Sequence, residues 1–238
     1  FREPHHSSSI AALVGGGTKA RPGEVSLAHG GVLFLDELAE WQRGHLDALR
    51  QTVESGKAVV SRANHHVTYP ARFQLIAAMN PCRCGYLGDP ARACTKAPLC
   101  SRQYLSRISG PMLDRFDMMI EVGEVPISAM SRSGEGEDTA VILERVHAAR
   151  EFASIRPQQK DNPINAQLPP DRLEDAVRLQ AKASKLIEDA AEKQGLSARG
   201  YHRVLKVART IADLDQSGDV TTAHAGEALQ YRRLPVQA

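Results

Sequence analysis

The sequence lacks the features that are typical of membrane-spanning proteins, of secreted proteins and of highly basic nucleic-acid-binding proteins. Its 238 residues contain no apolar run of about 18 residues, the length that a membrane-spanning helix requires. No basic, apolar and small-residue leader is visible, so we expect neither a membrane span nor a signal peptide, and a cytoplasmic location follows as the default. The 30 basic residues nearly balance 28 acidic ones, so any basic surface must be local. At 42% hydrophobic residues, the chain can bury one substantial core or two modest ones.

The first half of the chain alternates between strand-like and helix-like patterns. Val32–Leu35 and Phe73–Met79 are apolar runs of strand length, whereas Trp41–Glu54 carries its apolar residues at helical spacing. A further strand is predicted over Met118–Val122. The alternation predicts an α/β layer.

The composition changes in the second half. Residues 124–138 are rich in Ser, Gly and Glu and have little to bury, which predicts a linker. We therefore expect an α/β core over 1–123, the linker, and a helical bundle over 139–238. Ser197 is expected to cap the third helix. The predicted helices are Thr139–Ile155, Asp171–Gln194, Ser197–Leu214 and Thr222–Arg233.

The apolar run "GGVLFLDELAE" ends in two acids, Asp36 and Glu37. The carboxyl end of a buried parallel strand is where open α/β sheets place their ligands. In nucleoside triphosphatases such a pair works as an Asp that holds Mg²⁺ and a Glu that polarises the attacking water. The alternative is structural, with Asp36 capping the next helix and Glu37 lying in its first turn.

Two further polar residues come after this pair. Asn80 ends the apolar run "LIAAMN", where an amide can orient the attacking water, although Asn-Pro also begins turns. Arg115 lies between two acids in "GPMLDRFD". Arginine stabilises phosphoryl-transfer charge from a neighbouring subunit, and the alternative is a solvated or ion-paired side chain.

All four cysteines fall within nineteen residues, in "CRCGYLGDPARACTKAPLC". Four thiolates satisfy a tetrahedral Zn²⁺ in a structural site, although the spacing departs from the common paired C-x2-C form. Free thiols and redox disulfides remain alternatives. The predicted zinc ligands are Cys82, Cys84, Cys94 and Cys100.

A β-hairpin is predicted from Val59–Ser61 and His66–Tyr69. Its basic or titratable side chains and the aromatic Tyr69 suit contact with DNA, and the alternative is a solvated hairpin with incidental basic residues. The candidate DNA contacts are Lys57, Arg62, His65 and His66.

Four segments together resemble the magnesium-chelatase-like AAA+ proteins of the ComM/YifB family: "FREPHHSSSIAALVGGGTKARPGEVSLAHGGVLFLDEL", "AAMNPCRCGY", "RISGPMLDRFD" and "LSARGYHRVLKVARTIADL". The resemblance implies a partial AAA+ parallel-sheet core with an inserted β-hairpin, followed by an all-α helical lid. It also implies ATP and Mg²⁺ as cofactors and a ring homo-oligomer, a hexamer. By the same resemblance Asp36 and Glu37 are the Walker B acids, Asn80 is sensor 1, Arg115 is the arginine finger and Arg199 is sensor 2.

The phosphate-binding motif G-x-x-x-x-G-K-[ST] is missing from this sequence. The string "GGGTKA" at residues 15–20 does not match it. Family members carry this motif upstream of the "FR-PHH" segment, so we expect a chain that begins after it or has lost it, and weak nucleotide binding by these residues alone.

Three functions remain open. The first is an ATP-driven ring motor on DNA, acting in branch migration and recombination during natural transformation. The second is a chelatase-type ATPase that drives metal insertion into a tetrapyrrole. The third is a zinc-bearing interaction module without enzymatic activity.

Overall fold

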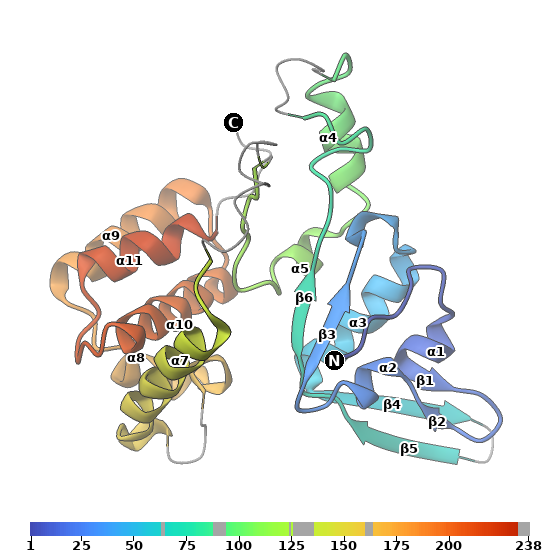
Figure 1. Ribbon diagram of the computed structural model, residues 1–238, viewed down its shortest axis with the longest axis horizontal. Coiled ribbons are helices and arrows are strands. Elements are labelled where there is room, and N and C mark those ends of the chain that lie inside the picture. Colours follow the sequence, from blue (N-terminus) through green and yellow to red (C-terminus); the bar gives the residue numbers. More distant parts are fainter. Residues whose placement is uncertain (63–64, 88–93, 124, 126–135, 160–163, 233–238) are drawn as a thin grey trace. The chain divides into compact units, whose positions relative to one another are not determined.

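A computed structural model describes the chain except residues 63–64, 88–93, 124, 126–135, 160–163 and 233–238. Contacts between residues divide the chain into two units, Phe1–Phe116 and Asp117–Gln237 (Figure 1). Most of the linker predicted over 124–138 lies outside the described residues, so the boundaries at 123 and 139 stay predictions.

The sheet of unit 1 is built around one buried strand. Strand β3 (Val32–Leu35) pairs in parallel with β6 (Gln74–Ala77), with Leu35 opposite Ala77. Arg2 forms a parallel bridge to Leu33 on the other side of β3. Leu33 and Leu35 are fully buried, so β3 is the central strand that the apolar run predicts.

Two hairpins accompany this sheet. Strands β4 (Lys57–Arg62) and β5 (His65–Pro70) pair antiparallel and are inserted between β3 and β6 in the chain, as predicted (Figure 1). A shorter hairpin joins β1 (Gly15–Gly16) to β2 (Arg21–Pro22), so "GGGTKA" forms a turn. Position 23, directly after β2, requires glycine, because a Cβ on Gly23 would lie 2.4 Å from the backbone nitrogen of Gly15.

The helices of unit 1 cover the sheet. Helix α3 buries Leu46 and Leu49 among the core residues Leu35, Trp41 and Met112. This burial accounts for the helical spacing in the sequence. The helices are α1 (Ile10–Val14), α2 (Glu24–Leu27), η1 (Leu38–Glu40), α3 (Arg43–Ser55), α4 (Leu99–Leu105) and α5 (Gly110–Leu113).

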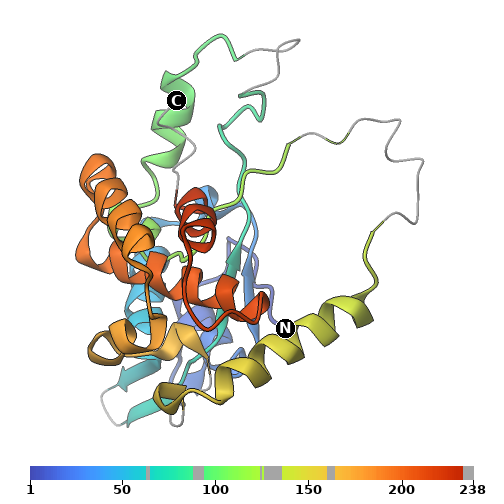
Figure 2. The ribbon, with the colours of Figure 1, turned by 90° about the vertical axis from the view of Figure 1, so that its left-hand side faces the viewer.

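Unit 2 is helical, with α10 at its centre. Helix α10 packs against each of the other four described α-helices of unit 2. Figure 2 shows these helices from a second side. Ser197 caps it as predicted, because the Ser197 side chain accepts a hydrogen bond from the backbone N–H of Gly200. The elements are α7 (Thr139–Ser154), η2 (Pro157–Gln159), η3 (Asn165–Gln167), α8 (Pro170–Val177), α9 (Ala181–Gln194), α10 (Ala198–Leu214) and α11 (Thr222–Gln230).

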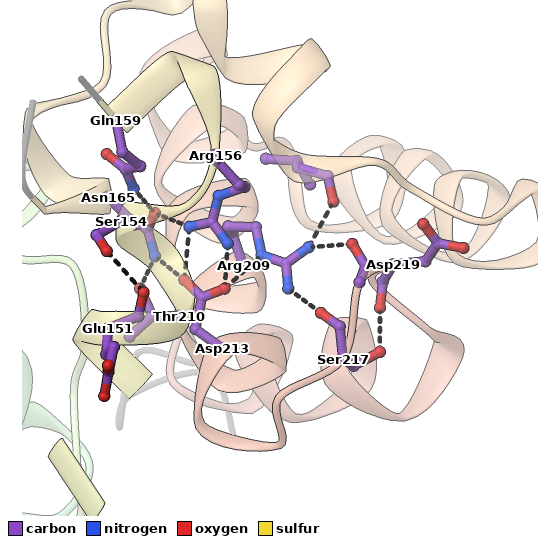
Figure 3. Close-up of polar contacts among 12 residues, drawn as sticks. Glu151, Ser154, Arg156, Gln159, Asn165, Arg209, Thr210, Asp213, Ser217 and Asp219 are labelled. Carbon is purple, nitrogen blue, oxygen red and sulfur yellow. Dashed lines mark hydrogen bonds and ion pairs between the residues drawn. The ribbon is translucent and has the colours of Figure 1, made fainter. Parts of the chain in front are cut away.

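A polar network lies inside unit 2 (Figure 3). The Arg209 side chain is fully buried, and its Nε donates to Oδ1 of Asp213 at 3.0 Å. Arg156 donates to both carboxylate oxygens of Asp213, the longer contact being 2.8 Å to Oδ2. Asn165 Nδ2 donates to the same Oδ2 at 2.7 Å. One buried carboxylate thus links the segment after α7 to helix α10.

The predicted fold class, a partial parallel-sheet core with an inserted hairpin followed by a helical bundle, is confirmed. The strand predicted over Met118–Val122 is wrong. This segment makes no ladder with any described strand, and Met119 N donates instead to Tyr231 O at 2.8 Å. The side chain of Val122 is 84% exposed. Apolar composition predicted a strand here, but a strand also requires a partner.

The single helix predicted over Asp171–Gln194 is also wrong, because it is two helices, α8 and α9. Arg178 ends α8 in the left-handed conformation, with φ of 50°. Leu179 then forms a parallel bridge to Val220, and Gln180 N donates to Val220 O at 3.1 Å. A tertiary pairing therefore interrupts a helical pattern that contains no Gly or Pro.

Candidate functional site

Asp36 and Glu37 leave β3 at its carboxyl end, and both are exposed. Glu37 adopts the left-handed conformation, with φ of 50° and ψ of 48°. Oδ1 of Asp36 accepts from the backbone N–H of Glu37 at 2.8 Å, and the Asp36 carbonyl accepts from Nε1 of Trp41 at 3.0 Å. A left-handed residue other than Gly is uncommon, and such residues cluster at functional sites as well as occurring at turns and helix ends.

The structural alternative for these acids does not fit the geometry. Helix α3 begins at Arg43 with Gln42 as its N-cap, so neither acid caps it or lies in its first turn. Glu37 is the N-cap residue of η1 and makes no side-chain capping bond there. Capping of α3 therefore does not account for either acid.

The neighbouring strand brings Asn80 to the same edge. Beyond β6, Ala78 N donates to Leu35 O at 3.0 Å, and Leu38 N donates to Ala78 O at 2.9 Å. Asn80 follows two residues later and is exposed. Because β3 and β6 are parallel, their carboxyl ends place the two acids and Asn80 on one side of the sheet.

His6 completes this edge, and the sequence patterns did not assign it a role. Its Nδ1 lies 3.2 Å from Oε2 of Glu37, and the ring of His5 lies 4.2 Å from the ring of His6. The bridge between Arg2 and Leu33 of β3 brings the segment "FREPHH" to this edge, and no pattern in the sequence predicts that bridge.

Arg115 is engaged within unit 1. Its side chain is 8% exposed, with Nη2 2.5 Å from Oε2 of Glu54 and Nη1 donating to the Pro111 carbonyl at 2.6 Å. This is the ion-paired alternative for Arg115. Arg199 is the second residue of α10, in unit 2, and is exposed.

The four cysteines converge. Their Sγ atoms all lie within 4.8 Å of one another, and none forms a disulfide. Cys82 is buried and Cys84 is exposed, with 3.2 Å between their sulfurs. The backbone N–H of Tyr86 lowers the pKa of Cys84, but hydrogen bonding with the Cys82 and Cys94 thiols raises it, to about 12.

The long hairpin carries exposed basic groups. Lys57 and His66 are exposed, and the backbone register places Arg62 opposite His65 at the far end of the hairpin. A hollow of about 400 Å³ at the base of the hairpin is lined in part by Lys57, Arg72 and His29.

Tyr69, the aromatic residue of the hairpin, packs in part against the core of unit 1. It is half-buried, and its hydroxyl donates to the Ala20 carbonyl at 2.8 Å, which ties the two hairpins together.

Comparison with known proteins agrees with this architecture. Residues 1–130 match the family model described as magnesium chelatase, subunit ChlI, and residues 136–232 match the model of its C-terminal part. The chain belongs to the magnesium chelatase subunit ChlI family. Within this ChlI family, it is 48% identical over 236 residues to competence protein ComM of Haemophilus influenzae and 46% identical over 235 residues to protein YifB of Escherichia coli.

These alignments cover 98% of this chain but 45% of each relative, so the chain spans about half the length of the curated relatives that it matches. A shorter alignment, 37% identical over 70 residues, covers 29% of the chain and 20% of the magnesium-chelatase 38 kDa subunit of Acidiphilium rubrum. In the described part of this ChlI-family chain, no helix has the length and apolar character required to cross a bilayer.

Proposed function

We propose that this chain is part of an ATP-hydrolysing ring motor that acts on DNA. The observation that carries the proposal is the edge where β3 and β6 end, with two exposed acids, a left-handed Glu37 and an adjacent amide. Membership of the ChlI family supports an ATPase of the AAA+ type.

The residues at this edge fit the cofactors. Carboxylate oxygens are the ligands that Mg²⁺ prefers, and Asp36 would hold the ion that neutralises triphosphate charge. Glu37 takes the proton of the attacking water, and Asn80 orients that water. Arg199, in unit 2, keeps the sensor 2 role that the family resemblance implies, which is contact with the terminal phosphate.

His6 is proposed as a positioning residue for Glu37. Nδ1 of His6 lies 3.2 Å from Oε2 of Glu37, and this close polar contact restricts where that oxygen can lie and so favours one direction for the other oxygen. A carboxylate held in this way can accept a proton from water without first losing side-chain freedom.

Arg115 remains the proposed arginine finger, acting on the nucleotide of a neighbouring subunit in a hexameric ring. For this role it must exchange Glu54 for a phosphate oxygen. The ion pair with Glu54 then describes a resting position, in which the guanidinium is held without a nucleotide.

DNA is the proposed substrate because the sequence of the long hairpin carries Lys57, Arg62, His65 and His66, of which Lys57 and His66 are exposed. The hollow beside Lys57 adds Arg72, and such grouped basic side chains suit phosphate contacts. The name of the Haemophilus influenzae relative associates that protein with competence. The name of the Acidiphilium rubrum relative favours the second candidate, a chelatase-type ATPase.

Glu37→Gln tests the ATPase proposal in the assembled protein. We expect ATP binding to persist and hydrolysis to fall at least ~100-fold, since the amide cannot take the proton. Glu40→Gln is the matched control, because the Glu40 carboxylate binds Nη1 of Arg107 at 2.8 Å and is not part of the proposed site. Unchanged turnover in Glu37→Gln would remove Glu37 from the mechanism.

A binding assay distinguishes the two substrates. A DNA motor binds DNA with an affinity that falls steeply as salt rises, because each phosphate contact releases counterions. A chelatase subunit shows ATP hydrolysis that responds to a tetrapyrrole-binding partner and not to DNA.

A further inference from the structure

The cysteine cluster gathers ligands from separate segments. Cys82 and Cys84 follow the end of β6, whereas Cys100 is the second residue of α4. We propose that Cys82, Cys84, Cys94 and Cys100 bind one zinc ion that braces the chain between β6 and α4. This inference does not depend on the ATPase proposal.

The sulfur separations fit a single tetrahedral ion. Zinc–sulfur bonds of about 2.3 Å place the sulfurs of a tetrahedral site about 3.8 Å apart. The four Sγ atoms lie within 4.8 Å of one another, and those of Cys82 and Cys84 are 3.2 Å apart. The tetrahedral value of about 3.8 Å lies between these two separations.

Other uses of four cysteines fit less well. A disulfide requires sulfurs at about 2.05 Å, well below the 3.2 Å between Cys82 and Cys84. An iron–sulfur cluster binds its thiolates through several irons, so they stand further apart than around one ion. All-sulfur tetrahedral coordination without an open position is typical of structural zinc.

The surroundings hold the ligands in place. Ser101, which is buried, donates its hydroxyl to the Pro81 carbonyl at 2.8 Å, so the residues next to Cys100 and Cys82 are joined. Outer contacts of this kind orient metal ligands. The backbone N–H of Gly85 also donates to the Cys82 carbonyl at 3.1 Å.

The position of the cluster in the fold indicates the role of the ion. Cys82 lies two residues after Asn80, at the edge where β6 ends. An ion that joins this segment to α4 limits its movement without contributing an open coordination position. Loss of the ion should therefore raise amide exchange in residues 81–87 and 94–105.

Elemental analysis of protein purified without chelators or a metal-affinity tag tests the proposal. We expect about one zinc per chain. Cys84→Ser should lower zinc content at least ~10-fold and reduce the unfolding temperature. Arg83→Ala is the control. Arg83 is exposed and lies between Cys82 and Cys84 in the sequence, and this variant should retain zinc.

A second measurement keeps the test decisive if the cysteine variant does not fold. Titration of the native protein with a mercurial should release one zinc into a chromogenic chelator as four thiols react. Folded protein with less than about 0.1 zinc per chain, one iron in its place, or a Cys82–Cys84 disulfide would overturn the proposal.

Discussion

Replacement of Arg209 by Met should destabilise unit 2 strongly. The Arg209 side chain is fully buried. Its Nη1 donates to the carbonyls of Val177, at 3.2 Å, and Gly218, at 2.9 Å. Its Nη2 donates to the Ser217 carbonyl at 2.5 Å. Burial lowers the pKa of Arg209, and the Asp213 carboxylate opposes that shift.

The magnitude follows from what the substitution leaves behind. Removal of one partner from a buried ion pair costs about 3–5 kcal/mol, because the other charge stays buried. Arg156 still binds Asp213, which points to the lower end of that range. Each carbonyl that loses its donor adds about 1 kcal/mol. We expect the free energy of unfolding to fall by at least ~3 kcal/mol. Most of this loss of stability should fall on the helices of unit 2.

Urea denaturation followed by far-ultraviolet circular dichroism measures this change. Arg145→Met is the matched control, since Arg145 forms an exposed ion pair with Glu137 at 2.9 Å, with side chains 51% and 55% exposed. Exposed pairs contribute about 0–1 kcal/mol. A loss below ~1 kcal/mol at Arg209, or one equal to the control, would refute the reasoning.

Three further predictions concern the proposed motor. Mixing Arg115→Ala subunits with Glu37→Gln subunits should restore partial ATP hydrolysis if Arg115 acts on its neighbour, and no rescue at any ratio counts against the finger. His6→Ala should lower kcat by about 10-fold with little change in KM, with partial rescue by His6→Asn, whereas an equal fall in a His5→Ala control would contradict a positioning role. Lys57→Ala should weaken DNA binding and reduce the slope of log affinity against log salt by about one, and an unchanged slope would remove Lys57 from the interface.

The sequence predicted the elements whose patterns are local. Strand β3 and the long hairpin lie where the apolar and β-prone runs predicted them. The residues that are buried in β3, and those that pair in the hairpin, are the residues of those same runs. The same holds for α10, whose buried residues recur at helical spacing after the Ser197 cap.

The failures depend on contacts between distant residues. The break between α8 and α9 comes from pairing of Leu179 with Val220, about forty positions further along the chain. No Gly or Pro in the segment itself predicts the break. Likewise, Met118–Val122 has the composition of a strand without a described partner. The contact of His6 with Glu37 required the parallel bridge of Arg2 to β3, which no spacing rule supplies.

Trp41 gives the proposed site a built-in optical reporter. It is the only tryptophan in the sequence, its side chain is buried, and its indole N–H bonds to the carbonyl of Asp36. Indole emission responds to the polarity and hydrogen bonding around the ring. A ligand that shifts the Asp36 backbone should therefore change the intrinsic fluorescence, so occupancy of the acidic edge can be followed without a label.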